Sequence, residues 1–223
     1  MIVVAEGVLS PGELESIRAR LASGRFIDGA ASATGAAKAE KRVLQLDREQ
    51  DGQREPGEIV ARALLRHRLV QQAVQPKITR HPTINRYEPG MSYGKHLDLP
   101  LMSGSVPTRA DVSCTVFLSE PETYEGGELS IHADAAPLAF KCRAGDAVLY
   151  PADSIHEVKA VRTGTRLVAV TWFQSFVRDT SRRKILFDLA LALETFERTS
   201  AETDAILHLR AAYQNLQRRW LET

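Results

Sequence analysis

The chain has 223 residues, of which 43% are hydrophobic, and this is enough for one good-sized domain core with an appended subdomain. Its 29 lysines and arginines against 28 aspartates and glutamates give a formal net charge of +1, and no basic stripe stands out. This balance argues against nucleic acid as the main partner, because nucleic-acid-binding domains concentrate positive charge.

The sequence carries no signal for export or for membrane insertion. The apolar start from Met1 is interrupted at Glu6, and no later apolar run reaches the length of a membrane span. Without a secretion signal, we expect Cys114 and Cys142 to be reduced thiols and not a disulfide. The sequence therefore predicts a cytoplasmic protein with no membrane partner.

Residues 1–76 are predicted to be mainly helical. Ser10 and Glu13 have the spacing of a capping box at the start of one helix. Pro56 opens a second helix, because apolar residues recur after it at helical spacing. Between the two helices, residues 28–39 are small and polar, so we expect a mobile loop that closes over a site as a lid.

From about residue 77 to residue 177, short β-rich runs alternate with turn signals. The runs are TINRY, DVSCTVFL, GELSIH, LAFKC, AVLYP, HEVKAV and RLVAVTWF. Regular short strands of this kind indicate a β-sandwich or barrel. We expect the acidic turn PETYEGGE to be a solvated loop, and a hairpin at RTGT to fold Arg166 back against Val161.

Helical spacing returns in residues 178–223. One apolar stripe runs from Ile185 to Phe196 and a second from Ile206 to Trp220. We expect both stripes to pack against the β core, with a homodimer through these helices as an open alternative. The sequence thus predicts a mainly β core with flanking helices, in three segments: 1–76, 77–177 and 178–223.

The stretch YGKHLDLPLM sets His96 and Asp98 one residue apart. Alternate side chains of a strand point to the same face, so these two metal donors would lie together, although a hydrogen-bonded pair gives the same pattern. Among the other histidines, His156 stands out because it begins HEVKAV within the same β region. Arg166 follows ten residues later and begins the last long strand.

Two histidines and one carboxylate, with three positions left open, make the facial triad of non-haem Fe(II) oxygenases. Two open positions can take a chelating 2-oxo acid, and the third can take O₂. The backbone of Arg166 would lie on the order of 16 Å from that of His156 at strand rise. At that depth a guanidinium can hold the far end of an elongated dicarboxylate, because its planar donors grip a carboxylate bidentately.

With these residues in place, the sequence resembles the Fe(II)/2-oxoglutarate dioxygenases of the prolyl-4-hydroxylase-like group, and specifically the bacterial PKHD-type hydroxylases. The resemblance runs through NRYEPGMSYGKHLDLPLM, RADVSCTVFLSEPETYEGGEL, AGDAVLYPADSIHEVKAVRTGTR and WFQSFVRD, and extends into both helical ends. It implies a double-stranded β-helix, or jelly-roll, core from about Lys77 to Phe176.

The resemblance also implies roles for six residues. The family's iron ligands, which are also its catalytic residues, correspond to His96, Asp98 and His156. Its 2-oxoglutarate-binding residues correspond to Arg166, Tyr87 and Trp172, with plain core aromatics as the alternative for the last two. The implied activity uses O₂ to hydroxylate a substrate and converts 2-oxoglutarate to succinate and CO₂, and the family is commonly associated with L-ascorbate.

Other functions stay open from the residues alone. A sensor on the same fold would bind iron and 2-oxoglutarate without hydroxylating anything. A cupin-like zinc site for hydrolysis is a weaker alternative, because hydrolysis needs no carboxylate clamp at the depth of Arg166. A peptide, a free amino acid or a small metabolite would each suit an open barrel mouth, and the resemblance suggests a link to iron acquisition.

Overall fold

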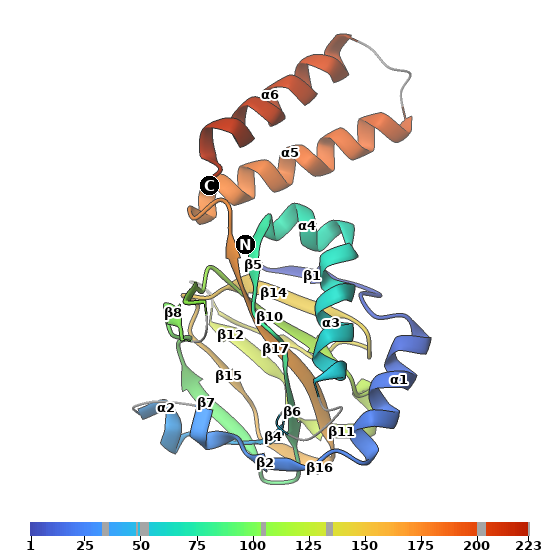
Figure 1. Ribbon diagram of the computed structural model, residues 1–223, viewed down its shortest axis with the longest axis vertical. Helices are drawn as coiled ribbons and strands as arrows, with labels where there is room; N and C mark the ends of the chain where they lie inside the picture. Colours follow the sequence, from blue (N-terminus) through green and yellow to red (C-terminus); the bar gives the residue numbers. More distant parts are fainter. Residues whose placement is uncertain are drawn as a thin grey trace.

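The computed structural model describes residues 1–32, 36–47, 49, 54–103, 106–132, 136–199 and 204–222. Two β-sheets face each other at the centre, helices cover the outer side of the larger sheet, and a helical hairpin stands at one end (Figure 1). The prediction of a mainly β core with flanking helices is therefore confirmed. Among the described helices, none has the length and apolar character needed to cross a bilayer.

The larger sheet is antiparallel and has β17 near its middle, hydrogen-bonded to β10 on one side and to β6 on the other. A further strand, β5 (Pro76–Thr79), pairs with the far end of β17. In spatial order its main strands are β1 (Val3–Ala5), β14 (Ala147–Pro151), β10 (Val112–Phe117), β17 (Arg166–Ser175), β6 (Thr83–Tyr87), β4 (Leu44–Leu46) and β2 (Phe26–Asp28).

The smaller sheet is also antiparallel and carries β15 beside β7 at its centre. In spatial order its strands are β13 (Pro137–Phe140), β12 (Leu129–His132), β15 (His156–Val158), β7 (Ser92–His96) and β3 (Lys41–Arg42). Two short ribbons complete the strands: β11 (Tyr124–Gly126) with β16 (Val161–Gly164), and β8 (Leu101–Met102) with β9 (Thr108–Arg109).

Helices α1 (Pro11–Ala22), α3 (Glu55–Arg66) and α4 (Arg68–Val74) precede the β core. The predicted capping box is confirmed, since the Ser10 hydroxyl caps Glu13 N–H and the Glu13 carboxylate accepts from Ser10 N–H. The single helix predicted from Pro56 is wrong, because the backbone is extended at His67 and separates α3 from α4.

Buried apolar residues form two layers on the two faces of the larger sheet. Phe117, Leu129 and Val168 belong to the layer between the sheets. Ile17 and Leu64 belong to the layer between the larger sheet and the helices. All six residues of β10 are buried, because both faces of this strand are covered. Ser113 and Thr115 are the polar residues of this strand, and both are buried.

Two expectations about strands are corrected. Residues 1–76 contain the expected helices, but they also contain four short strands that were not expected, β1, β2, β3 and β4, and these extend both sheets. The hairpin at RTGT does not fold Arg166 against Val161, because β16 pairs with β11 while β17 pairs with β10, β6 and β5. Consecutive strands here change sheets, which places Val161 and Arg166 in different layers. The division into 1–76, 77–177 and 178–223 stays a prediction.

The predicted loop at residues 28–39 contains two short helical turns, η1 (Gly29–Ser32) and α2 (Ala36–Ala39). Residues 33–35 lie outside the described residues, so the lid stays a prediction. A third short turn, η2 (Pro121–Thr123), precedes β11. Cys114 and Cys142 are both free, which confirms that they do not form a disulfide.

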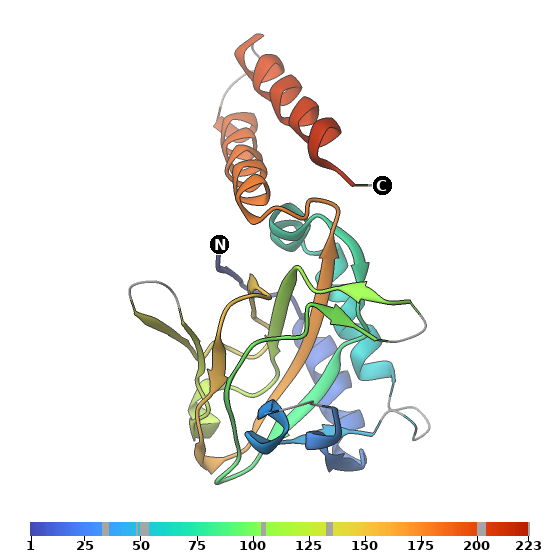
Figure 2. The same cartoon turned by 90° about the vertical axis from the view of Figure 1, so that its left-hand side faces the viewer.

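The chain ends in a hairpin of α5 (Thr180–Thr199) and α6 (Asp204–Trp220), which projects from the β core (Figure 2). Helix α5 packs against α4. In the predicted stripe, Leu186 and Leu193 are buried as expected, whereas Ile185 and Phe196 are 44% and 49% exposed. Only part of the predicted apolar stripe therefore packs against the core.

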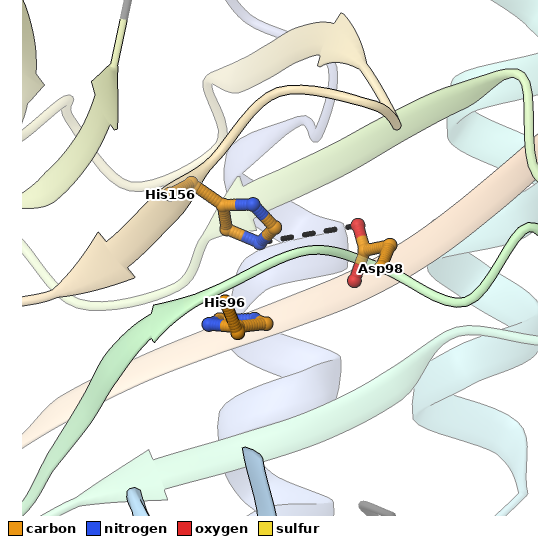
Figure 3. A group of neighbouring side chains, drawn as sticks. All are labelled: His96, Asp98 and His156. Atoms are coloured by element: carbon orange, nitrogen blue, oxygen red, sulfur yellow. Dashed lines mark ion pairs between the residues drawn. The ribbon is translucent and has the colours of Figure 1, made fainter. Parts of the chain in front are cut away.

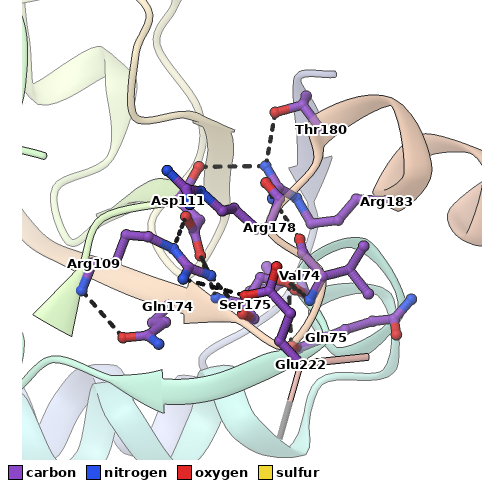
Figure 4. A network of polar contacts seen from close by, with 11 residues as sticks. Val74, Gln75, Arg109, Asp111, Gln174, Ser175, Arg178, Thr180, Arg183 and Glu222 are labelled. Carbon is purple, nitrogen blue, oxygen red and sulfur yellow. Dashed lines mark hydrogen bonds and ion pairs between the residues drawn. The ribbon is translucent and has the colours of Figure 1, made fainter. Parts of the chain in front are cut away.

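A polar network ties this hairpin to the exit of β17 (Figure 4). Asp111 accepts hydrogen bonds from Arg109 at 2.8 and 3.0 Å and from the backbone N–H of Ser175 at 2.9 Å. Arg183 of α5 is 3% exposed and donates to two backbone carbonyls of the β17–α5 connection, both at 2.7 Å. Glu222, beyond α6, pairs with Arg109 at 3.4 Å and so returns the chain to the core.

Candidate metal and co-substrate site

Three donors meet between the strands of the smaller sheet (Figure 3). His96 ends β7, His156 begins β15, and the two residues lie opposite each other in the ladder. Asp98 follows two residues after β7, beyond the strand on which it was expected. One ligand atom from each of the three lies within 4.8 Å of the others, and Nε2 of His156 is 3.9 Å from Oδ2 of Asp98. The structure therefore brings together all three predicted metal ligands.

The two imidazoles present the same nitrogen toward this meeting point. Nδ1 of His96 lies 2.8 Å from the carbonyl oxygen of Gly94, and Nδ1 of His156 lies 3.0 Å from that of Ser154. A carbonyl oxygen only accepts, so Nδ1 carries the proton in both rings and the lone pair of Nε2 is left free. This tautomer is the one that a metal ligated through Nε2 requires.

Aromatic rings hold both histidines in place. Tyr93 stacks on His96 with ring centroids 3.6 Å apart, and Tyr150 meets His156 edge-on at 5.0 Å. Burial, together with the positive charge that His156 can carry, lowers the pKa of His96 to about 4. His96 is therefore neutral near pH 7, as a metal ligand must be.

Asp98 is oriented by the opposite sheet. The hydroxyl of Ser113, in β10, donates to Oδ2 of Asp98 at 2.5 Å. The Asp98 side chain is 9% exposed. A carboxylate with one oxygen held in this way presents its remaining lone pairs in a fixed direction. Sequence inspection did not single out Ser113, because a serine within an apolar strand gives no signal of its own.

Arg166 begins β17 and is 1% exposed, so its side chain is inside the barrel. Its three guanidinium nitrogens form no hydrogen bond of good geometry with the residues that the structure describes, although Arg166 is close enough to Tyr87 and Tyr124 to oppose the rise in pKa that burial causes in both hydroxyls. The rings of Tyr87 and Phe117 lie 5.0 and 5.7 Å from the guanidinium carbon. A buried cation without a paired anion is costly, so this arrangement suits an anionic ligand. The distal carboxylate of 2-oxoglutarate is such an anion.

The two predicted pocket aromatics lie at opposite ends of the barrel interior. Tyr87 pairs in register with Arg166 and is 2% exposed. Trp172 is six residues further along β17, on the same face as Arg166, and lies opposite Ser113. Its half-buried indole has a buried Nε1 with no partner within the described chain. Trp172 therefore lies toward Asp98, and its role in the pocket stays a prediction.

One residue near Arg166 was missed from the sequence. Tyr124, in the acidic turn that we expected to be solvated, is 3% exposed and belongs to β11. The neighbouring Glu122 and Glu125 are exposed as expected, so the expectation is wrong for the tyrosine and for the buried Gly126 and Gly127 that follow. The signal that was available is an aromatic residue between two acidic residues and immediately before Glu-Gly-Gly.

Comparison with known proteins agrees with this geometry. The family model described as the 2OG-Fe(II) oxygenase superfamily matches residues 82–174, and that of the PKHD-type hydroxylase C-terminal domain matches residues 180–222. A PKHD-type hydroxylase from Methylobacterium nodulans is 41% identical over 226 residues, with 100% of both chains covered. Another from Crocosphaera subtropica is 39% identical over 222 residues, again with 100% of both chains covered.

Solved structures support the fold. A prolyl hydroxylase from Trichoplax adhaerens, in complex with a peptide fragment of the hypoxia inducible factor oxygen degradation domain, has a TM-score of 0.59 at 14% identity, covering 77% of this chain and 82% of that one. A Pseudomonas putida prolyl-4-hydroxylase has a TM-score of 0.53 at 20% identity, covering 78% and 92%. The sequence relatives go further than the fold, and the chain belongs to the PKHD-type hydroxylases, oxygenases of the 2OG-Fe(II) superfamily.

Proposed function

We propose that His96, Asp98 and His156 hold Fe(II) and that Arg166 holds the distal carboxylate of 2-oxoglutarate in a dioxygenase that hydroxylates an organic substrate. The convergence of three ligand atoms within 4.8 Å, in the same barrel as a buried arginine with no hydrogen-bond partner in the described structure, carries this proposal. When bound, iron with 2-oxoglutarate and O₂ supplies the oxidising chemistry, with succinate and CO₂ as the co-products.

The protein's own residues bind and orient. The Nε2 atoms of His96 and His156 face the metal position because their Nδ1 atoms are occupied by backbone carbonyls. Ser113 fixes one oxygen of Asp98. Arg166 sets the depth of the co-substrate, and the apolar layer between the sheets, including Phe117, excludes water from around it. Tyr87 and Trp172 are proposed to line the same pocket.

The finer points of the function rest on the resemblance. We propose a peptide, an amino acid or a small metabolite as substrate, with a link to iron acquisition, and L-ascorbate as the agent that keeps iron ferrous. A cytoplasmic location is supported by two cysteines that are not bonded to each other. A homodimer through α5 and α6, and the division at residues 76/77 and 177/178, belong to the same proposal. Membership of a hydroxylase family does not favour the sensor alternative.

The proposal is tested by succinate formation from 2-oxoglutarate by anaerobically purified protein, supplied with Fe(II), ascorbate and air. Asp98→Ala is expected to abolish turnover, whereas Arg166→Ala mainly raises the KM for 2-oxoglutarate. His96→Ala serves as the background. Normal kinetics in these variants would refute the site. Anaerobic binding of 2-oxoglutarate without succinate formation, whichever candidate substrate is added, would favour the sensor.

A further inference from the structure

Tyr124, in the ribbon of β11 and β16, lies near the Arg166 side chain. Gly127 lies between the two: a methyl group built at its Cα would be 2.9 Å from Cδ of Arg166 and 3.2 Å from Cε2 of Tyr124. The Arg166 stem and the Tyr124 ring edge that is next to its hydroxyl therefore border the same small space. Tyr124 thus reaches the anion-binding end of the barrel from a ribbon outside both main sheets.

Two glycines make this close approach possible. Gly126 and Gly127 have φ values of +74° and +67°, a conformation that favours glycine. A side chain at Gly126 would meet the carbonyl oxygen of Ala160 at 2.1 Å, which no substitution can relieve without moving the backbone. The Glu-Gly-Gly sequence after Tyr124 is therefore what turns the chain inward and carries the tyrosine with it.

The Tyr124 hydroxyl is buried and has no acceptor for its proton in the described part of the protein, because the nearby Arg166 guanidinium can only donate to it. The tyrosine is held from its other side by Lys141, whose Nζ donates to the Tyr124 carbonyl at 2.7 Å and lies 4.3 Å from the ring centroid. Burial raises the pKa of Tyr124, although the nearby Arg166 opposes part of that rise. The phenol thus stays protonated and can donate a hydrogen bond.

The distal carboxylate that Arg166 is proposed to hold needs more donors than one guanidinium gives. A carboxylate offers about four lone-pair sites, and a bidentate arginine uses two of them. Phe117, which lies 5.7 Å from the guanidinium carbon, has no polar group to offer. Tyr124 has a donor at this end of the barrel that no protein acceptor in the described structure takes up.

We propose that Tyr124 is a second binding residue for the distal carboxylate of 2-oxoglutarate, and that its hydroxyl donates to the carboxylate beside Arg166. This inference rests on the proposed function, because it requires 2-oxoglutarate to lie with that end at Arg166. It gives the acidic turn of residues 121–128 a direct part in co-substrate recognition.

The test is Tyr124→Phe, which removes one oxygen atom and keeps the ring. Binding is measured anaerobically on the Fe(II) protein by the visible absorption that appears when a 2-oxo acid chelates the metal. Two probes are compared: 2-oxoglutarate, and pyruvate, which has the same chelating end but no distal carboxylate. The Kd for 2-oxoglutarate is expected to rise about tenfold or more, since hydrogen bonds to charged groups are the strong ones. The Kd for pyruvate should not change.

Tyr213→Phe, in α6 and away from the barrel, is the matched control and should leave both Kd values unchanged. Equal binding of 2-oxoglutarate by the wild type and Tyr124→Phe would overturn the role of Tyr124 and leave the proposed function standing. An equal loss for both probes would overturn it as well, because Tyr124 would then act through the metal end or the fold. Failure of the wild type to bind 2-oxoglutarate at all would instead remove the proposed function.

Discussion

The hydroxyl of Ser113 lies 2.5 Å from Oδ2 of Asp98. This contact joins β10 of the larger sheet to a proposed metal ligand that comes just after β7, a strand of the smaller sheet. Replacing Ser113 by alanine frees the carboxylate to rotate and removes its hydrogen bond. Loss of a side chain that hydrogen-bonds a metal ligand typically lowers metal affinity about 10- to 100-fold, so we expect Ser113→Ala to weaken Mn(II) binding by roughly that factor. Titration followed by electron paramagnetic resonance measures free Mn(II) directly.

Ser130→Ala is the control for this prediction, because Ser130 is also buried but belongs to β12 and does not contact Asp98. It should bind Mn(II) as the wild type does. Unchanged Mn(II) affinity in Ser113→Ala would mean that the Asp98 orientation is set by the backbone after β7 and not by the hydroxyl.

Because Arg166 has no paired anion among the residues described, we expect its replacement to stabilise the ligand-free fold and to weaken binding of 2-oxoglutarate. Without a ligand the protein keeps a buried guanidinium with no acceptor within the described structure, so replacing it with the apolar side chain of methionine removes an uncompensated charge. We expect Arg166→Met to raise the free energy of unfolding of the ligand-free protein by about 1–3 kcal/mol. The increase in Tm that 2-oxoglutarate causes in the wild type should disappear.

Differential scanning calorimetry with and without 2-oxoglutarate checks both effects. A ligand-free Arg166→Met protein that melts well below the wild type would show that Arg166 supports the fold through contacts other than the proposed anion. Retention of the ligand-induced increase in Tm would contradict its role as the carboxylate anchor.

The Glu13 carboxylate predicts a loss of stability in acid. Its hydrogen bonds with Arg66, at 2.6 Å, lower its pKa from 4.5 to about 2, with Ser10 adding to the effect. Because the folded pKa is below the unfolded one, this stabilisation is complete above about pH 4.5 and is lost as the pH falls toward 2. Glu13→Gln should lower the free energy of unfolding by about 1 kcal/mol at pH 7. The value is small because the Glu13–Arg66 pair is only partly buried.

Chemical denaturation at pH 7 and at pH 3 tests this prediction. The difference between the wild type and Glu13→Gln should shrink at the lower pH, because Glu13 of the unfolded protein, with its pKa of 4.5, is then protonated while the folded carboxylate is still largely ionised, and this favours unfolding. A difference that is the same at both pH values would indicate that the charge of Glu13 is unimportant and that only its packing matters.

We expect the hydrogen bonds of Asp111 to fix the α5–α6 hairpin to the β core. Its side chain is 7% exposed and satisfies Arg109 and the backbone of Ser175. Asp111→Ala leaves the Ser175 N–H unpaired and leaves Arg109 with only its longer contacts to Glu222 and the Ser175 carbonyl, both at 3.4 Å, so we expect a loss of about 2–4 kcal/mol in the free energy of unfolding. Urea unfolding monitored by circular dichroism gives this value.

Asp188→Ala is the matched control, since Asp188 forms an exposed pair with Lys184 within α5. Such pairs contribute only about 0.3–0.5 kcal/mol, so this variant should unfold almost as the wild type does. Equal effects of the two substitutions would place the attachment of the hairpin in its apolar contacts and not in the Asp111 network.

The sequence predicted the site better than the strands around it. His96, Asp98 and His156 could be chosen because metal chemistry limits the donor types, because His96 and Asp98 are one residue apart, and because His156 begins a β-rich run. Strands such as β3, with two residues, were missed because pairing with distant partners and not local propensity makes them strands. Segments this short carry no alternating pattern for a sequence to reveal.

Around Arg166, too, the sequence predicted some features, while others depend on contacts between distant parts of the chain. Its position at the start of β17 was predicted, but its predicted ladder partner was wrong, because the connection at RTGT passes from the β11–β16 ribbon to the larger sheet. Tyr124 was taken for part of a solvated turn, since Glu122 and Glu125 beside it are polar. Its burial depends on the positive φ values of Gly126 and Gly127, which turn the chain inward. There it meets Arg166, which is more than thirty positions away in the sequence.

The place of β17 between β10 and β6 has a consequence for synthesis on the ribosome. Every other strand of both sheets is translated before β17, yet the larger sheet has a gap at its centre until Ser175 has emerged. Until then β10 and β6 each present an unpaired edge and an apolar face, the features that promote aggregation and recruit chaperones. The nascent chain therefore closes its barrel late, in one insertion step that also carries Arg166 into the interior.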